Sequence, residues 1–155
     1  MVSSDDKYIF SGSTDYSLKV FDISTKQQIH HFKKIHSGNK IKKTEPTHNL
    51  GWIFSVAVSN NNKYIVTGSE DRSIKVLNLE LEQESFHIDQ AHNGLFFYWL
   101  SCLIIKGGVS SVCFSKDNRY IISGSYDKSI KIIHAQTNEL LHTFERAHSG
   151  MLSIS

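Results

Sequence analysis

Cysteine, proline and long hydrophobic runs are scarce in this sequence. Its 155 residues include two cysteines, Cys102 and Cys113, and one proline. Two isolated cysteines form neither a disulfide framework nor a zinc-ligand pattern. The longest apolar stretch, from Leu95 to Ile105, is well short of the roughly 18 residues that a bilayer span needs. The sequence therefore predicts free thiols and no membrane partner.

Excess charge of either sign is also lacking. With 17 basic and 15 acidic side chains the formal net charge is +2, which excludes a polycationic or an acidic tail. Hydrophobic residues make up 39% of the chain, enough for a packed core. Residues 1–6 contain neither a basic nor an apolar segment, so no secretion signal is recognised. The expected location is the cytoplasm, with the nucleus as the alternative.

What the sequence does contain is an internal repeat. Three segments align without gaps, and seven of their 15 columns are identical: residues 7–21 (KYIFSGSTDYSLKVF), 63–77 (KYIVTGSEDRSIKVL) and 119–133 (RYIISGSYDKSIKII). The offset between successive segments is the same both times, and a His-x-Gly sequence follows that spacing at His36, His92 and His148. The chain is therefore a tandem array.

Each repeat has the pattern of short strands. β-Branched and aromatic runs at 55–59 and 111–115 precede polar turns, which is typical of a first strand and its hairpin turn. In the second repeat a second strand is expected at 64–69, and after a turn centred on Asp71 residues 73–76 alternate with the period of a pleated strand. Weaker fourth strands are expected near 27–32, 85–88 and 140–144. Because no helical period occurs, the fold class is all-β.

These residues resemble one known family. The four strands per repeat, the Ser/Thr-Gly-Ser-x-Asp turn, the Ser-Ile-Lys-Val strand and the His-x-Gly junction are similar to the WD-repeat (Trp-Asp repeat) β-propeller family. The resemblance implies that each repeat forms one four-stranded antiparallel blade and that the blades stand around a central axis. The chain departs from the family at the naming pair, which is Phe21-Asp22, Leu77-Asn78 and Ile133-His134 here.

The resemblance also implies a buried hydrogen-bond relay in each blade. It would join a strand hydroxyl, the turn aspartate and the junction histidine, and it would end at the hydroxyl because Leu77 and Ile133 have no side-chain N–H to donate. The residues implied are Ser11 and Asp15 in the first blade, His36, Thr67 and Asp71 in the second, and His92, Ser123 and Asp127 in the third. No histidine precedes the first blade in the sequence.

Ser or Thr, His and Asp are also the parts of a nucleophilic hydrolase triad. A catalytic site is built once, whereas this set recurs in successive repeats at a fixed spacing, which favours a structural role. The sequence has no Gly-x-Ser-x-Gly elbow and no phosphate-binding glycine loop. Its nine histidines form no zinc-ligand pattern. We therefore expect no enzyme activity, no catalytic residue, no metal and no cofactor.

Two segments lengthen the repeats. A repeat of this family has about 40–45 residues, and the excess lies in residues 39–51 and 95–107, each directly after a His-x-Gly junction. The first segment is polar, and the second is mostly apolar. They are either projecting loops, the second a docking plug for a partner, or translated non-coding sequence. The second interpretation is slightly favoured, because unrelated insertions of equal length rarely arise at equivalent sites.

The predicted organisation is one partial propeller over residues 1–155. Repeat 1 spans 1–34, repeat 2 spans 35–90, repeat 3 spans 91–146, and residues 147–155 begin a fourth. Closed propellers have four to eight blades, so about three blades predict an open or incomplete ring. The chain would then be a fragment of a longer propeller, or it would self-associate to complete the ring.

The sequence predicts a non-catalytic scaffold that binds other proteins through turns on a rigid base. The side chains beside each turn aspartate differ between repeats, and they are the candidate partner contacts: Thr14, Tyr16, Glu70, Arg72, Tyr126 and Lys128. One alternative is a regulatory or targeting segment of a larger enzyme, of the kinase or ubiquitin-ligase type. A weaker one is phosphate or nucleic-acid binding through the lysines between Lys33 and Lys43. Since the net charge is near zero, nucleic acid is not the expected partner.

Overall fold

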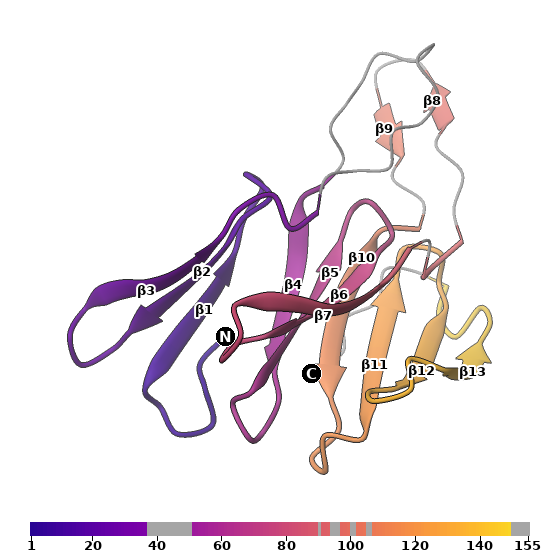
Figure 1. The fold of residues 1–155 in the computed structure, drawn as a ribbon. Helices are drawn as coiled ribbons and strands as arrows, with labels where there is room; N and C mark the ends of the chain where they lie inside the picture. The colour runs from indigo at the N-terminus through magenta and orange to yellow at the C-terminus, as the bar shows by residue number, and fades with distance from the viewer. Residues whose placement is uncertain (37–50, 90, 94–96, 100–101, 105–106, 150–155) are drawn as a thin grey trace.

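Three antiparallel sheets stand side by side (Figure 1). This computed structural model describes residues 1–36, 51–89, 91–93, 97–99, 102–104 and 107–149. All regular structure within those residues is strand. No helix there could span a membrane.

The strands of each sheet follow one another in chain order. Blade 1 contains β1 (Tyr8–Gly12), β2 (Leu18–Asp22) and β3 (Gln27–Phe32). Blade 2 contains β4 (Ile53–Val58), β5 (Tyr64–Ser69), β6 (Ile74–Asn78) and β7 (Gln83–Ile88). Blade 3 contains β10 (Val109–Phe114), β11 (Tyr120–Ser125), β12 (Ile130–His134) and β13 (Leu140–Phe144).

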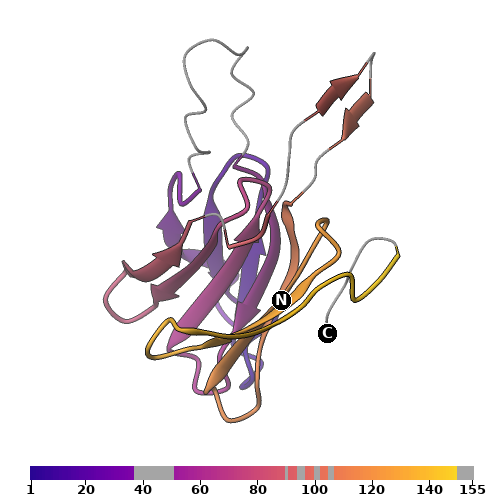
Figure 2. The same ribbon diagram turned by 90° about the vertical axis from the view of Figure 1, so that its right-hand side faces the viewer.

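A separate hairpin lies inside the segment 95–107. Its strands are β8 (Phe97–Trp99) and β9 (Cys102–Ile104), and they pair antiparallel. The hairpin projects beyond the ends of the three blades (Figure 2). Residues 39–50 of the other predicted insertion lie outside the described residues.

The all-β prediction is confirmed, and several strands match their predicted ranges. The strands β3, β5 and β13 have the predicted bounds, whereas β4 and β10 begin two residues before the predicted first strands. The reason is a register shift between Ile53 and Ser55, and an equivalent one between Val109 and Ser111. Such a bulge interrupts the alternation from which a strand is recognised in sequence. In blade 1 the first strand is reduced to a bridge between Val2 and Ile9.

The hydrophobic core lies between the blades. One buried cluster joins Phe10, Leu18 and Val20 of blade 1 to Ile65 and Leu77 of blade 2. A second cluster repeats this arrangement in the next repeat, and it joins blade 2 to blade 3 through Val66, Ile74, Val76, Ile121 and Ile133. Blade 2 therefore packs one sheet face against blade 1 and the other face against blade 3.

Glycine allows the blades to approach closely at one position of β5. A Cβ atom on Gly68 would lie 2.7 Å from Cγ1 of Val109 and 3.1 Å from Cγ1 of Val112, both on β10 of the next blade. Gly12 faces Ile53 and Val56 on β4 in the same way. Close backbone approach is what a glycine inside a predicted strand indicates.

The blades also contact one another at the turns between their first two strands. The backbone N–H of Ser4 donates to Oδ1 of Asn62 at 3.1 Å, and its hydroxyl donates to the carbonyl of Asn60 at 2.9 Å. The same arrangement links blade 2 to blade 3, where the N–H of Asn60 donates to Oδ1 of Asn118 at 2.7 Å and its side-chain amide donates to the carbonyl of Lys116. We call this series of bonds the turn ladder.

Gly68→Ala should destabilise the protein by about 1–3 kcal/mol, because the added methyl group overpacks the interface with Val109. Urea unfolding of the two proteins measures the difference. Val109→Ala in the same chain removes the clashing Cγ1 atom, so the double variant should lose less than the sum of the two single losses. Full additivity, or a Gly68→Ala protein as stable as its parent, would contradict the close packing.

Candidate functional site

A buried imidazole links blade 1 to the turn of blade 2. His36 follows the last strand of blade 1, and its ring is fully buried. Its Nε2 atom lies 2.8 Å from Oγ1 of Thr67 on β5, and its Nδ1 atom lies 2.8 Å from Oγ of Ser73 and 3.4 Å from Oδ1 of Asp71. The structure therefore brings together the three residues predicted for this blade. Both ring nitrogens have a partner.

The third blade repeats this geometry around His92. Its Nε2 atom lies 2.8 Å from Oγ of Ser123, and its Nδ1 atom lies 3.1 Å from Oδ2 of Asp127 and 3.0 Å from Oγ of Ser129. The backbone N–H of Asn93 also donates to Oδ2 of Asp127 at 2.9 Å. The junction is thus held to the turn by its main chain as well as by its side chain.

A serine two residues after each turn aspartate belongs to the same network. The hydroxyls of Ser17, Ser73 and Ser129 donate to Asp15, Asp71 and Asp127 at 2.6, 2.6 and 2.7 Å. Their backbone N–H groups donate to the same carboxylates. Sequence reasoning missed these serines, although an Asp-x-Ser pattern at the same place in all three repeats carries the signal.

Blade 1 has the turn without the imidazole. Asp15 accepts from Ser17, but both Asp15 and the strand hydroxyl of Ser11 are exposed. Among the described residues no histidine ring contacts either of them. The equivalents of Ser11 in the other blades, Thr67 and Ser123, are fully buried.

The burial of these groups argues against hydrolase chemistry. His36, Thr67, His92 and Ser123 expose none of their surface, so no substrate can reach the hydroxyl or the ring. The hydroxyl of Thr67 also donates to the carbonyl of Lys75, and Oγ1 lies 3.5 Å from that carbonyl oxygen. The side chain that replaces the family tryptophan there, Leu77, packs in the apolar cluster between the blades.

Hydrogen bonding keeps Asp71 and Asp127, the two turn aspartates beside an imidazole, ionised. Burial would raise the pKa of the Asp71 carboxyl, but the hydrogen bond and charge of His36, with the hydrogen bonds of Ser73, lower that pKa from 3.8 to about 2. For Asp127, burial opposes the effects of His92 and Ser129 in the same way, and its pKa is also about 2. At neutral pH each imidazole therefore faces a carboxylate.

The second position of the naming pair keeps a structural role in all three blades. Oδ1 of Asp22 accepts from the N–H of Thr25 at 2.8 Å, and Oδ1 of Asn78 accepts from the N–H of Glu80 at 2.9 Å and of Leu81 at 3.1 Å. Nδ1 of His134 accepts from the N–H of Gln136 and of Thr137 at 3.3 and 3.2 Å. Asn and His can thus replace the aspartate, because each offers an acceptor to the turn.

The candidate partner contacts lie at the turns between the second and third strands, which we call the rim. Thr14 and Lys128 are exposed, and Tyr16, Arg72 and Tyr126 are half-buried. Tyr16, Arg72 and Lys128 occupy equivalent positions with φ angles of 71°, 72° and 72°. The Tyr126 ring packs edge-on against Phe54 with centroids 5.8 Å apart. Five of the six residues therefore present surface at the rim.

Glu70 is the exception, and its prediction as a partner contact was wrong. Its side chain is fully buried. Its backbone N–H donates to the carbonyl of Trp52 at 3.0 Å. This hydrogen bond holds the turn at Glu70 next to the residue that precedes β4. Position beside a turn aspartate does not by itself predict exposure.

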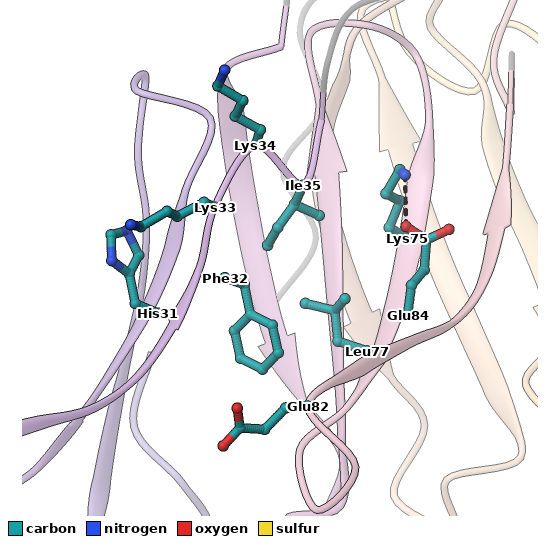
Figure 3. Close-up of a pocket in the computed structure, with 9 residues that line it drawn as sticks. All are labelled: His31, Phe32, Lys33, Lys34, Ile35, Lys75, Leu77, Glu82 and Glu84. Atoms are coloured by element: carbon teal, nitrogen blue, oxygen red, sulfur yellow. Dashed lines mark hydrogen bonds and ion pairs between the residues drawn. The ribbon is translucent and has the colours of Figure 1, made fainter.

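A pocket of about 460 Å³ lies between the outer strands of blades 1 and 2. Phe32, Ile35 and Leu77 lie in its middle, and Lys75 pairs with Glu84 at 2.7 Å on one side (Figure 3). Lys33 and Lys34 line it together with Glu82 and Glu84. Because carboxylates share the pocket with the lysines, it is a poor site for a phosphate. The other lysines of the predicted patch, Lys40, Lys42 and Lys43, lie outside the described residues.

The described part of the chain contains no group of three or more His, Cys, Asp or Glu side chains that could hold a metal ion. The described free thiol is that of Cys113, and burial raises its pKa. A thiol with a raised pKa is a weak nucleophile.

Comparison with known proteins decides the family. The family model described as "WD domain, G-beta repeat" matches residues 2–22, 39–78 and 101–134, together more than half of the chain. The chain belongs to the WD-repeat family. Within this family its three sheets are blades, and the buried His-Asp sets recur as parts of the blade framework.

WD-repeat proteins of known sequence and structure resemble the chain. It is 26% identical over 173 aligned residues to a Xenopus laevis protein named "U3 small nucleolar RNA-associated protein 15 homolog", and the match covers 93% of this chain and 31% of that protein. The chain thus spans about a third of the length of this curated relative.

Two solved structures share the fold. "Crystal structure of RRP9 WD40 repeats" superposes with a TM-score of 0.71 at 19% identity and covers 97% of this chain and 38% of that one. "Structure of U3-55K" superposes with a TM-score of 0.72 at 20% identity and covers 97% and 39%. At this identity the likeness shows the fold alone, and the family's blade arrangement is confirmed.

Asp71→Ala and Asp127→Ala should each destabilise this WD-repeat protein by about 1–3 kcal/mol, because the variant leaves a buried imidazole N–H without its carboxylate. Asp15→Ala is the matched control, since Asp15 makes the same bonds to its serine without contacting an imidazole, and it should cost less. Thermal unfolding of the three variants makes the comparison. Equal losses in all three would show that the imidazole contributes nothing.

Stability should fall as the pH is lowered from about 4 to about 2. The two turn aspartates have a pKa of about 2 in the folded protein against an ordinary 3.8, so their carboxylates stabilise the fold above pH 4 by about 2 kcal/mol each. This contribution disappears as the folded carboxylates take up protons near pH 2. Urea unfolding at pH 5, 3 and 2 measures the slope, and an Asp71→Asn, Asp127→Asn double variant should have a shallower one.

Proposed function

We propose that the chain is a non-catalytic scaffold that binds other proteins through the rim. The observation that supports this most directly is that one repeated backbone turn carries different side chains in each blade. The turn residues that follow the aspartates share nearly the same φ angle yet are Tyr16, Arg72 and Lys128. A rigid frame that presents unlike side chains at regular intervals is suited to recognising a partner's surface.

The rim side chains are of the kinds that dominate protein interfaces. Tyrosine and arginine combine a large contact area with a polar group, and they are enriched among residues that carry binding energy. Tyr126 is held against Phe54, so little conformational freedom would be lost when a partner covers it. Arg72 lies two residues before Ile74, whose side chain is buried in the core. The packing of Ile74 anchors the main chain at Arg72.

The absence of catalysis is part of the proposal. The Ser/Thr, His and Asp sets that resemble a hydrolase triad are buried and bonded to one another. The complete sets, around His36 and around His92, have a structural role between neighbouring blades. The proposal that the chain regulates or targets a larger enzyme has no supporting observation among the described residues.

The names of the relatives support a nuclear setting in place of the predicted cytoplasmic one. The Xenopus relative is named for association with a small nucleolar RNA, and one superposed structure is of a protein named U3-55K. We therefore place the scaffold in an RNA–protein assembly of the nucleus. The expectation that nucleic acid is not a partner has no support from these relatives, and RNA contact belongs to the same proposal.

The triple variant Tyr16→Ala, Arg72→Ala, Tyr126→Ala should bind the partner proteins at least about tenfold more weakly, since each change removes interface area at the rim. Capture of nuclear proteins by the immobilised chain identifies the partners, and titration of one purified partner gives the affinity. The control is Tyr64→Ala, Arg119→Ala, which alters an exposed tyrosine and arginine at the opposite end of the blades.

Undiminished binding by the rim variant, or equal loss in the control, would discard the rim as the contact surface. Repeating the titration at increasing salt separates a protein contact from an RNA contact. Affinity for RNA held by lysines falls steeply with salt concentration, whereas contacts through Tyr16 and Tyr126 depend on it little.

A further inference from the structure

The pocket between the outer strands of blades 1 and 2 takes no part in the turn ladder or in the histidine contacts. Its middle is apolar and is formed by Phe32, Ile35 and Leu77 (Figure 3). Its volume of about 460 Å³ lies within the range of about 300–1,000 Å³ that is typical of ligand sites. The pocket is therefore large enough for a bulky apolar side chain and the peptide groups beside it. We call it the outer pocket.

Opposite charges lie at the two ends of the outer pocket. Lys34 projects from one end and Glu82 from the other, and the three apolar side chains lie between them (Figure 3). Lys34 is exposed and makes no ion pair among the described residues. Oε1 of Glu82 lies 2.8 Å from Nδ1 of His30, whereas its Oε2 atom has no hydrogen bond within the described part of the chain. Each end thus presents a charged group that can bind an opposite charge.

The walls of the outer pocket are fixed by contacts within the protein. The N–H of Ile35 donates to the carbonyl of Tyr16 at 2.9 Å, and Nζ of Lys75 donates to Oε2 of Glu84 at 2.7 Å. Lys75 and Glu84 neutralise each other, and the side chain of Lys33 points away from the apolar middle (Figure 3). A ligand would therefore meet preformed walls, which spares it the entropic cost of ordering them.

The charged ends do not recur at the next junction between blades. The constant offset of the repeats places Gln90 at the position of Lys34 and Asn138 at the position of Glu82, and both of these residues are neutral. The histidine contacts that join the blades are present at both junctions. A pair of opposite charges found at one of the two junctions is thus not required to build a blade, and it is suited to recognising a ligand.

The outer pocket lies between two strand edges. Within the described residues β3 and β7 are the last strands of their sheets, and each pairs with another strand on one side only. Such an edge offers main-chain N–H and C=O groups to an extended peptide. A small apolar molecule would match the middle of the pocket, but it would leave the charged ends and the strand edges without partners. The chemistry of the pocket therefore favours a segment of peptide chain.

We propose that the outer pocket binds an extended segment of a partner protein in which a bulky apolar side chain lies between an acidic and a basic residue. The apolar side chain packs against Phe32, Ile35 and Leu77. The acidic residue pairs with Lys34, and the basic residue pairs with Oε2 of Glu82. This site contains no side chain of the rim, so it can be tested separately from the proposed function.

Fluorescent peptides that carry phenylalanine between an acidic residue and an arginine test the site. The set of peptides contains both orders of the charges and several spacings, with glycine at the other positions, and fluorescence anisotropy measures their affinity for the purified chain. The best peptide should bind about tenfold more tightly than the same peptide with glycine in place of phenylalanine. A set in which no peptide shows this difference would overturn the proposal.

Leu77→Trp should weaken binding of the best peptide at least about tenfold, because the larger side chain fills the middle of the outer pocket. Ile133→Trp is the matched control, since it makes the same change at the equivalent position of blade 3, and it should leave the affinity unchanged. The rim variant described above should also bind the peptide as the parent does, which separates this site from the rim. Equal losses in the two tryptophan variants, with circular dichroism showing both folded, would contradict the proposal.

An exchange of the two end charges tests the site without filling it. Lys34 and Glu82 are both exposed, so the double variant Lys34→Glu, Glu82→Lys leaves the core unchanged. The best peptide should bind this variant several-fold more weakly, the peptide with the opposite order of charges should bind it more tightly, and added salt should reduce both differences. An unchanged preference would overturn the proposal. So would self-association of the parent chain that the peptide displaces, because a second copy would then be the occupant.

Discussion

Each blade of this protein buries its apolar residues against a neighbouring blade, and everything else in the structure depends on that arrangement. A sheet of three or four short strands with both faces in water has little independent stability. Full burial of a side chain such as Ile74 or Val76 contributes about 1.5–3 kcal/mol, and that burial exists only when blade 3 is in place. Folding of one blade is thus coupled to the presence of the next, as in other repeat proteins.

Apolar packing alone would not fix how two blades are aligned, because the hydrophobic effect has no direction. The junction histidines supply that direction. His36 follows the last strand of one blade, and its two ring nitrogens contact the side chains of three residues of the next blade. A shift of one residue in the alignment of the two blades would break these contacts. A misaligned blade would leave a buried ring and a buried carboxylate without partners, and leaving a buried polar group unsatisfied costs more free energy than a correct hydrogen bond contributes. The polar network therefore selects one register from those the apolar faces would accept.

Much of this could be predicted from the sequence because the spacing of the repeats is constant. Three aligned copies made the strands and the residues around His36 and His92 recognisable. The histidine contacts themselves came from the resemblance to the family. The sequence did not reveal the extra residue at the start of β4, because a bulge breaks the alternation. Nor did it reveal that Glu70 is buried, because burial depends on which backbone groups the turn meets.

The turn ladder and the histidine contacts lie at opposite ends of the same strand. The strand β5 connects the turn that carries Asn60 and Asn62 to the turn that carries Asp71, and its six residues span about 20 Å. Two blades that are fastened at two points so far apart cannot fan open or tilt about either point without breaking the other. The angle between neighbouring blades is therefore a fixed property of the junction. A ring built from such units would change its diameter in whole-blade steps, and a partner that binds across several blades would meet a surface whose curvature does not adjust to it.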